Sequence, residues 1–178
     1  LQDSLLRSAR QELETLIDGT KGMDMLIFIG LPWQKDGKLY NVAAVIQNGE
    51  LLGLVPKRNL PNYSEFYELR HFTPGPAEPE AVEWRGRFVP FGSNILFRCA
   101  NIPELVAAAE VCEDVWVMNP PSISHAMAGA TVIANCSASD EATGKHAYRR
   151  DLIEGQSARL VCAYVYANAG EGESTQDL

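Results

Sequence analysis

Residues 105–116 read LVAAAEVCEDVW, a run of small and branched apolar residues that ends at a cysteine followed by two acids. Leu105–Val111 is interrupted only by Glu110, and consecutive apolar positions are typical of a strand buried on both faces. Cys112 stands where this strand is expected to end and the chain to turn, as a nucleophile does on a strand-to-turn elbow. The segment therefore predicts a buried sheet with a candidate nucleophile at the end of one strand.

Similar apolar runs recur along the chain and alternate with helical patterns. The spacing of apolar residues predicts helices over residues 1–17, 122–129 and 148–158. Strands are predicted over residues 25–30, 40–47, 50–56, 95–98, 105–111, 131–135 and 160–168, and a loop over 57–90. Asn48-Gly49 marks a hairpin between two of these strands. Because several strands are apolar on both faces, the pattern favours an α/β fold of sheets covered by helices.

Composition limits the classes of partner. The chain has 178 residues, which suits one domain, and its 46% hydrophobic and 21% charged residues are typical of soluble globular proteins. A net charge of −8 argues against a nucleic-acid partner. No apolar run approaches the roughly 20 residues that span a bilayer, and no secretion signal opens the chain. We therefore expect no membrane partner and a cytoplasmic location.

The four cysteines are Cys99, Cys112, Cys136 and Cys162, and none forms a CxxC pair. This spacing argues against a zinc ribbon, and the expected compartment favours reduced thiols. Most of them are expected to be small buried hydrophobic residues, which is also the plainer interpretation of Cys112. A reactive Cys112 would need a cation nearby to favour its thiolate form.

Lys57 is the candidate for that cation. It follows the predicted strand 50–56, where the chain enters a loop, and an ammonium near a thiolate lowers the thiol pKa and stabilises an oxyanion. Glu65 and Glu68 lie among tyrosines and phenylalanines further along, where a carboxylate would hold a lysine charged and oriented. Taken alone, a lysine at a strand end is more often a solvated charge, and the acids are more often exposed.

Four segments in order resemble one protein family. They are KRNLPNYSEFYELRHF (57–72), VCEDVW (111–116), NCSAS (135–139) and YANAG (166–170), the last continued by EGESTQD (171–177). Together they resemble the nitrilase-like glutaminase domain, a carbon-nitrogen hydrolase domain, of glutamine-dependent NAD synthetases. A lysine paired with CED would indicate only the wider nitrilase superfamily, whereas LPNYxEFYExR is specific to the synthetase branch.

The resemblance implies a nitrilase-type α-β-β-α sandwich, with helices outside two sheets packed face to face. The chain begins inside a helix and stops just after a loop, so we expect residues 1–178 to be a partial glutaminase domain, incomplete at both ends. The ATP-dependent synthetase domain of the family is expected to be absent from these residues, because they contain no Gly-rich ATP-binding loop.

The resemblance also implies roles for individual residues. Cys112 would attack the side-chain amide of glutamine to form a thioester and release ammonia. Lys57 and the backbone N–H of Glu113 would stabilise the tetrahedral intermediate. Glu65 would position Lys57 or the substrate, and Tyr63 would line the pocket. The α-amino and α-carboxylate groups of glutamine would be held by Ser139 and Lys145, the lysine as a point charge.

One family feature is missing from the sequence. The general-base glutamate belongs to a PEL-type motif upstream of the helix at residues 1–17, and no such motif exists here. Glu12 and Glu14 lie within that helix and are not expected to replace it. Because general-base catalysis contributes about 10²–10⁴ in rate, we expect the 178 residues alone to be inactive or nearly so.

The implied partners follow from the family reaction. Ammonia would pass to the synthetase domain, which would use ATP and Mg to convert deamido-NAD to NAD. The glutaminase step itself would need no metal and no cofactor. The expected partners are glutamine, the synthetase domain and further copies of the protein in a homo-oligomer.

Three alternatives remain open. The same Lys57 and Cys112 would serve a stand-alone amidase or carbamoylase of the nitrilase superfamily. A cysteine-protease-like pair would use His125 or His146 with Cys112. The missing glutamate also fits a non-catalytic segment that serves assembly.

Overall fold

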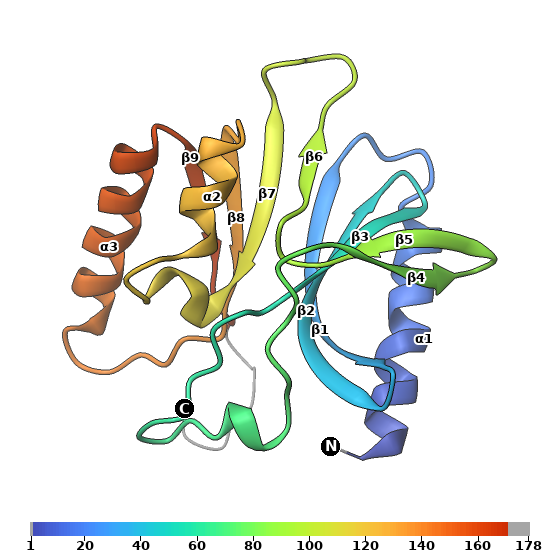
Figure 1. The fold of residues 1–178 in the computed structure, drawn as a ribbon, viewed down its shortest axis with the longest axis horizontal. Helices are drawn as coiled ribbons and strands as arrows, with labels where there is room; N and C mark the ends of the chain where they lie inside the picture. Colours follow the sequence, from blue (N-terminus) through green and yellow to red (C-terminus); the bar gives the residue numbers. More distant parts are fainter. Residues whose placement is uncertain (1, 171–178) are drawn as a thin grey trace.

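The computed structural model describes residues 2–170 as one α/β unit (Figure 1). The first part of the chain forms α1 (Asp3–Gly19), β1 (Leu26–Lys35), β2 (Lys38–Gln47), β3 (Glu50–Pro56), the short 3-10 helix η1 (Glu68–Arg70), β4 (Glu80–Trp84) and β5 (Arg87–Phe91). The second part forms β6 (Leu96–Arg98), β7 (Val106–Val111), the 3-10 helix η2 (Cys112–Val115), α2 (Pro121–Met127), β8 (Val132–Cys136), α3 (Lys145–Leu160) and β9 (Ala163–Ala167).

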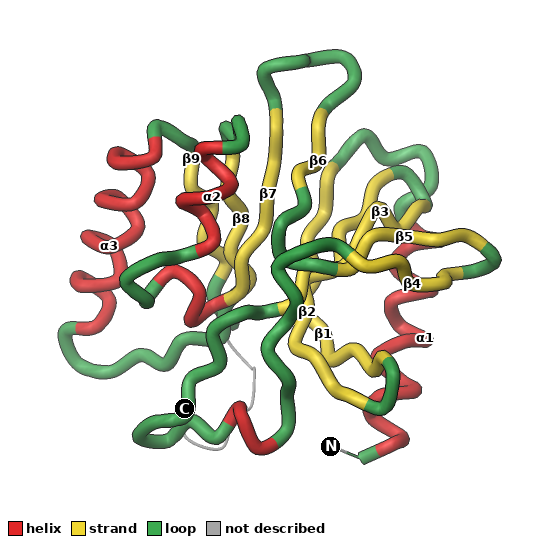
Figure 2. The backbone as a smooth tube through the Cα atoms, viewed as in Figure 1, coloured by secondary structure: helices red, strands yellow, loops and turns green. Residues whose placement is uncertain are grey.

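The strands form two sheets. The first has the order β1-β2-β3-β5-β4, with every neighbouring pair antiparallel except the parallel pair β3–β5. The second has the order β6-β7-β8-β9, in which β7, β8 and β9 run parallel. Parallel strands are joined through helices on the outer face, and α2 and α3 occupy that position (Figure 2).

Four layers result from the alternation of side chains along the strands. Leu13 and Ile17 of α1 pack on the outer face of the first sheet, beside Val42, Ala44 and Ile46 of β2. The neighbouring residues Ala43 and Val45 point the other way and meet Ala109 and Val111 of β7 between the two sheets. Because β2 is covered on both faces, residues 42–46 are all buried.

On its outer face, the second sheet packs Ala108 and Ile133 against Ala126 of α2 and Leu160 of α3. The order from one side to the other is thus helix, sheet, sheet, helix (Figure 1). This arrangement confirms the predicted α-β-β-α sandwich, and it confirms the prediction of helices covering buried sheets.

The hairpin predicted at Asn48-Gly49 is present between β2 and β3, with φ values of 48° and 78° at its two turn residues. The prediction of a loop over residues 57–90 was wrong for its last part, because residues 80–91 form the β4–β5 hairpin. Its turn uses Arg85 at φ 48° before Gly86, where asparagine or aspartate is the usual choice. Arg85 donates to Asp18 of α1 at 3.1 and 3.2 Å, a tertiary contact that sequence patterns do not reveal.

Several boundaries also differ from the predictions, and the strand predicted from residue 160 begins at Ala163 because α3 runs to Leu160. Strand β1 continues to Lys35 because it pairs with β2 along its whole length, and α3 begins at Lys145 rather than Tyr148. No helix among residues 2–170 has both the length and the apolar composition to cross a bilayer. The EGESTQD segment at 171–177 lies outside the described residues.

Candidate active site

Cys112 follows the last residue of β7 and opens η2. Its φ is 47°, a left-handed conformation that costs a non-glycine residue roughly 1–2 kcal/mol. Its backbone N–H donates to Oδ1 of Asn135 on the neighbouring strand β8 at 2.9 Å. The chain therefore turns sharply at the thiol, as the sequence predicted for a nucleophile at a strand end.

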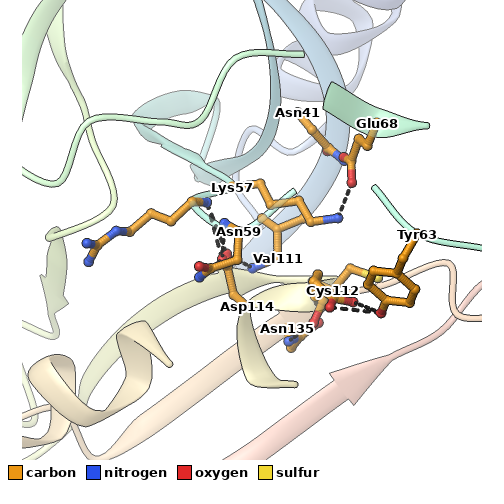
Figure 3. A network of polar contacts seen from close by, with 11 residues as sticks. Asn41, Lys57, Asn59, Tyr63, Glu68, Val111, Cys112, Asp114 and Asn135 are labelled. Carbon is orange, nitrogen blue, oxygen red and sulfur yellow. Dashed lines mark hydrogen bonds and ion pairs between the residues drawn. The ribbon is translucent and has the colours of Figure 1, made fainter. Parts of the chain in front are cut away.

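Asp114 joins this turn to the loop that follows β3. Its buried carboxylate accepts the backbone N–H of Val111 at 3.0 Å, that of Arg58 at 3.2 Å and that of Asn59 at 2.8 Å. The Asn59 side chain donates to it as well, at 2.8 Å. Burial raises the pKa of Asp114, and the hydrogen bonds oppose that rise. The acid of the CED motif thus fixes where the chain leaves Lys57 relative to Cys112 (Figure 3).

Lys57 is the residue after β3, and its side chain is only 3% exposed. Its ammonium forms an ion pair with Glu68 at 2.5 Å, and the other oxygen of Glu68 accepts from the side-chain amide of Asn41 at 2.7 Å. The backbone carbonyl of Asn41 also accepts the Lys57 N–H at 2.8 Å. Figure 3 shows the ammonium directed toward Glu68. Lysine, glutamate and asparagine therefore hold one another in place.

A cavity of about 1110 Å³ lies at these strand ends and collects the candidate residues. Its wall includes Lys57, Tyr63, Glu65, Glu68, Cys112, Glu113, Ser139 and Lys145. Every residue that the sequence singled out for glutamine chemistry therefore lines one space, although the residues come from four separate segments. A buried cation and a partly buried thiol on one wall suit nucleophilic attack on a polarised carbonyl.

Tyr63 and Glu113 meet across the cavity wall. The Tyr63 hydroxyl donates to the two carboxylate oxygens of Glu113 at 2.9 and 3.1 Å. Burial and the nearby Glu113 raise the pKa of Tyr63 to about 12, and burial raises that of Glu113. This contact links the loop after β3 to the turn of the nucleophile at a second point.

Ser139 and Lys145 come later in the chain: Ser139 follows β8, and Lys145 is the first residue of α3. Ser139 is buried, and its backbone N–H and carbonyl bond the side-chain amide of Asn168 at 2.8 and 3.0 Å. The Lys145 ammonium pairs with Asp140 and lies 5.7 Å from the centroid of the Trp116 ring. Contacts with nearby residues, Asn168 for Ser139 and Asp140 for Lys145, thus hold both residues at the cavity wall.

The partner of Lys57 differs from the one that the resemblance indicated. Glu68, not Glu65, makes the ion pair with Lys57, so the structure corrects that part of the expectation. Glu65 is exposed on the cavity wall, where its bond to the Ser64 hydroxyl lowers its pKa. The expected contact of Glu65 with substrate stays a prediction.

The histidines lie elsewhere. His125 of α2 is buried and bonds the backbone carbonyl of Ser93 at 2.8 Å, and burial lowers its pKa. His146 is exposed on α3. Neither belongs to the cavity wall described for residues 2–170, so the geometry gives the cysteine–histidine alternative no support.

Several residues that organise the site were not identified from sequence. Asn41, Asp114 and Asn135 hold Lys57, the loop and Cys112 through hydrogen bonds. The available signal was a polar residue inside an apolar strand for Asn41 and Asn135 and shortly after one for Asp114, and the last two also belong to the NCSAS and VCEDVW segments. That pattern marks a buried polar group in need of partners, but it does not identify the partners.

Comparisons with known proteins agree with this geometry. The carbon-nitrogen hydrolase family matches residues 3–171. A glutamine-dependent NAD(+) synthetase of Mycobacterium bovis is 44% identical over all 178 residues, which span 26% of that relative. The crystal structure of a glutamine-dependent NAD(+) synthetase from Cytophaga hutchinsonii superposes with a TM-score of 0.80 at 32% identity, covering 94% of this chain and 26% of that one.

A solved mutant of the Nesterenkonia AN1 amidase from the nitrilase superfamily shares the fold, with a TM-score of 0.61 at 20% identity over 92% of this chain and 53% of that one. The chain thus spans about a quarter of the length of the synthetases that it matches and just over half of this amidase. The family match, the four-layer fold and the strand-end thiol together place the chain in the carbon-nitrogen hydrolase family.

Proposed function

We propose that this chain is the glutamine amidohydrolase part of a glutamine-dependent NAD synthetase, with Cys112 as nucleophile. The observation that carries the proposal is that Cys112 and Lys57, which follow strands of different sheets, line one cavity with Tyr63, Ser139 and Lys145. Similarity to the synthetases of Mycobacterium bovis and Cytophaga hutchinsonii supports glutamine as the substrate.

The proposed reaction has two steps. The Cys112 sulfur attacks the side-chain amide carbon of glutamine, and the carbonyl oxygen becomes an oxyanion that faces Lys57 and the backbone N–H of Glu113. The carbon–nitrogen bond breaks, and the nitrogen leaves as ammonia with the proton that the thiol gave up. Water then attacks the γ-glutamyl thioester, which releases glutamate and restores the thiol.

A base must carry the thiol proton to the leaving nitrogen. By resemblance this base is a glutamate that the sequence does not contain, so we expect the 178 residues alone to turn over little or no glutamine. The role of Glu68 differs from that of a base, because its carboxylate is already engaged by Lys57 and Asn41. Glu68 instead keeps the Lys57 ammonium fixed for the oxyanion.

Replacement of Cys112 by alanine in the whole protein tests the proposal. We expect Cys112→Ala to abolish glutamine-dependent NAD formation and to preserve formation from free ammonia, since only the ammonia source is removed. Retained use of glutamine would show that the nucleophile is wrongly assigned. Faster turnover of N-carbamoyl amides than of glutamine by the wild type would instead favour the amidase or carbamoylase alternative.

The remaining features of the family belong to the same proposal. The ammonia would serve a synthetase domain outside these residues, which would use ATP and Mg to amidate deamido-NAD. The protein would act in the cytoplasm as a homo-oligomer. The glutaminase step would proceed with the side chains of the cavity and without a bound metal or cofactor.

A further inference from the structure

A buried polar chain lies behind Cys112, on the face of the second sheet that is turned away from the other sheet. Neighbouring strands supply one residue each: Glu110 from β7, Asn135 from β8 and Tyr164 from β9. Glu110 and Asn135 face each other directly in the parallel register and are each 1% exposed. None of the three has a role in the reaction proposed above, so their burial calls for a different explanation.

The hydrogen bonds run in one direction along this chain. Asn135 donates from Nδ2 to the Tyr164 oxygen at 3.1 Å, and the Tyr164 hydroxyl donates to the Glu110 carboxylate. The other oxygen of Glu110 accepts the backbone N–H of Ser122 at 2.8 Å. An ionised carboxylate, the form that Glu110 takes at the pH 8 of the test below, only accepts, and tyrosine has a single hydroxyl hydrogen, so Tyr164 has only acceptor capacity left for Asn135.

This direction fixes the orientation of the Asn135 amide. Its nitrogen must face Tyr164, and its oxygen must therefore face Cys112, where it accepts the backbone N–H at 2.9 Å. The amide nitrogen also lies 3.4 Å from the Cys112 carbonyl oxygen, so both backbone polar groups of the cysteine meet one side chain. An amide turned the other way would place two N–H groups against each other at Cys112.

Cys112 depends on such support because its φ is 47°. A left-handed conformation is unfavourable for cysteine and persists only where the surroundings impose it. The ladder between β7 and β8 has its last pair at Val111 and Cys136, so strand pairing no longer holds the next residue. At Cys112, the first residue beyond the ladder, the Asn135 side chain binds the backbone in place of strand pairing.

We propose that Asn135 is a positioning residue for the Cys112 nucleophile, oriented by Tyr164 and Glu110. The inference rests on the proposed function for its catalytic consequence, whereas the conformation of Cys112 is independent of the substrate. Loss of the amide would let the turn relax, and the sulfur and the Glu113 N–H would lose their common alignment. A misplacement of about 1 Å is enough to cost roughly 100-fold in rate.

The test compares Asn135→Ala with Ile133→Val in the whole protein at pH 8. Ile133 lies two residues earlier on the same face of β8 and is fully buried, but it packs only in the apolar cluster. We expect Asn135→Ala to lower kcat for glutamine by about 10- to 100-fold with KM within about threefold, as for an interaction that acts on the reacting geometry. Ile133→Val should keep the wild-type kcat, and both variants should keep ammonia-dependent synthesis.

The rate of Cys112 alkylation by iodoacetamide, followed by mass spectrometry of its peptide, needs no glutamine. We expect Asn135→Ala to change this rate by about tenfold or more, while Ile133→Val and the peptide of buried Cys162 stay at wild-type rates. Wild-type alkylation and wild-type kcat in Asn135→Ala would overturn the proposal. Wild-type protein that does not use glutamine would instead refute the proposed function, and the alkylation result would still decide the role of Asn135.

A second variant tests the chain behind the amide. Tyr164→Phe removes the group that orients Asn135 but keeps the Asn135 side chain, so we expect a smaller fall in kcat than Asn135→Ala gives. The double variant should be no slower than Asn135→Ala alone, because both changes act through the same amide. Additive losses in the double variant would contradict a common route through Asn135.

Discussion

Two partly or fully buried glutamates flank the nucleophile, and they are held in different ways. Glu68, on the cavity side, binds the Lys57 ammonium at 2.5 Å and the Asn41 amide at 2.7 Å. Glu110, on the outer face of the second sheet, accepts from the Ser122 N–H and the Tyr164 hydroxyl, which are both neutral. Burial raises the pKa of Glu110 to about 7.

The difference shows how one fold uses the same side chain for two purposes. A carboxylate beside a buried cation compensates that cation's charge, so Glu68 keeps Lys57 available where an oxyanion would form. A carboxylate among neutral donors imposes direction on their hydrogen bonds, and Glu110 does so for Tyr164 and Asn135. Glu68 thus keeps the Lys57 ammonium charged on the cavity side. Glu110 sets the direction of the hydrogen bonds of Tyr164 and Asn135 behind the Cys112 thiol.

On the cavity side, the largest effect is expected from Lys57→Met, which removes the cation proposed to stabilise the oxyanion. Loss of one oxyanion-stabilising group costs about 10²–10³ in kcat, and we expect a fall of this size for glutamine-dependent synthesis in the whole protein. Ammonia-dependent synthesis should be unchanged. Steady-state kinetics with each nitrogen source would measure both, and glutamine turnover within threefold of wild type would contradict the role of Lys57.

A double variant separates charge from chemistry at the same place. Lys57→Met leaves Glu68 buried without its cation, and breaking a buried ion pair by removing one partner costs roughly 3–5 kcal/mol. Lys57→Met/Glu68→Gln should regain part of the thermal stability that Lys57→Met loses, and it should regain no glutamine-dependent activity. Recovery of activity in the double variant would mean that Lys57 acts only as a structural counter-ion.

On the outer face, the expected effect is a pH dependence of stability. The pKa of Glu110 is raised from 4.5 to about 7, so the folded state holds a proton that the unfolded state releases at lower pH. Its contribution to stability is complete below pH 4.5 and is lost as pH rises through about 7. From pH 5 to pH 8 this loss amounts to about 2–3 kcal/mol.

Glu110→Gln removes that titration. We expect the variant to gain about 2–3 kcal/mol relative to wild type between pH 5 and pH 8, whatever its offset at pH 5. Hydrogen exchange of the β7 and β8 amides in the whole protein, corrected for intrinsic exchange at each pH, would measure the difference. Parallel pH profiles for the two proteins would show that Glu110 titrates near its usual pKa.

The fold was largely predictable because its signals are local. Apolar runs marked the strands of the second sheet, and Asn48-Gly49 marked a turn whose positive φ values its residues tolerate. The β4–β5 hairpin was not predicted because Arg85-Gly86 is an unusual turn sequence, and Asp18 of α1, distant in the sequence, supports it. Sequence patterns report what a segment prefers, and they do not report support from elsewhere in the chain.

The site was predictable only in part, for the same reason. Cys112 and Lys57 were identified from their places at strand ends and from the family motifs, and both line the cavity. The choice between Glu65 and Glu68 depended on which carboxylate the loop turns inward, and that follows from bonds to Asn41 and Lys57 on other elements. Asn135 opens the NCSAS segment, but the resemblance assigned it no role, because that role arises from its place beside Glu110 in the strand pairing.

A smaller effect is expected where Glu68 positions Lys57. Glu68→Gln keeps one acceptor oxygen but turns an amide N–H toward either Lys57 or Asn41, both of which donate. The ammonium should then shift without being lost, and we expect kcat for glutamine to fall about tenfold, less than for Lys57→Met. Kinetics of the two variants side by side would measure this order, and a larger loss in Glu68→Gln than in Lys57→Met would contradict a positioning role.

The smallest effect is expected from the neighbouring acid, which makes Glu65→Gln the matched comparison for Glu68→Gln. Glu65 is exposed on the cavity wall, and water screens its charge, so its contact with a bound substrate contributes modestly. We expect KM for glutamine to rise about two- to fivefold with kcat within about twofold, as for a group that binds ground state and transition state alike. A fall in kcat equal to that of Glu68→Gln would mean that Glu65 turns inward during the reaction and shares the support of Lys57. Unchanged KM and kcat would remove Glu65 from the site, and Lys57 would then be held by Glu68 and Asn41.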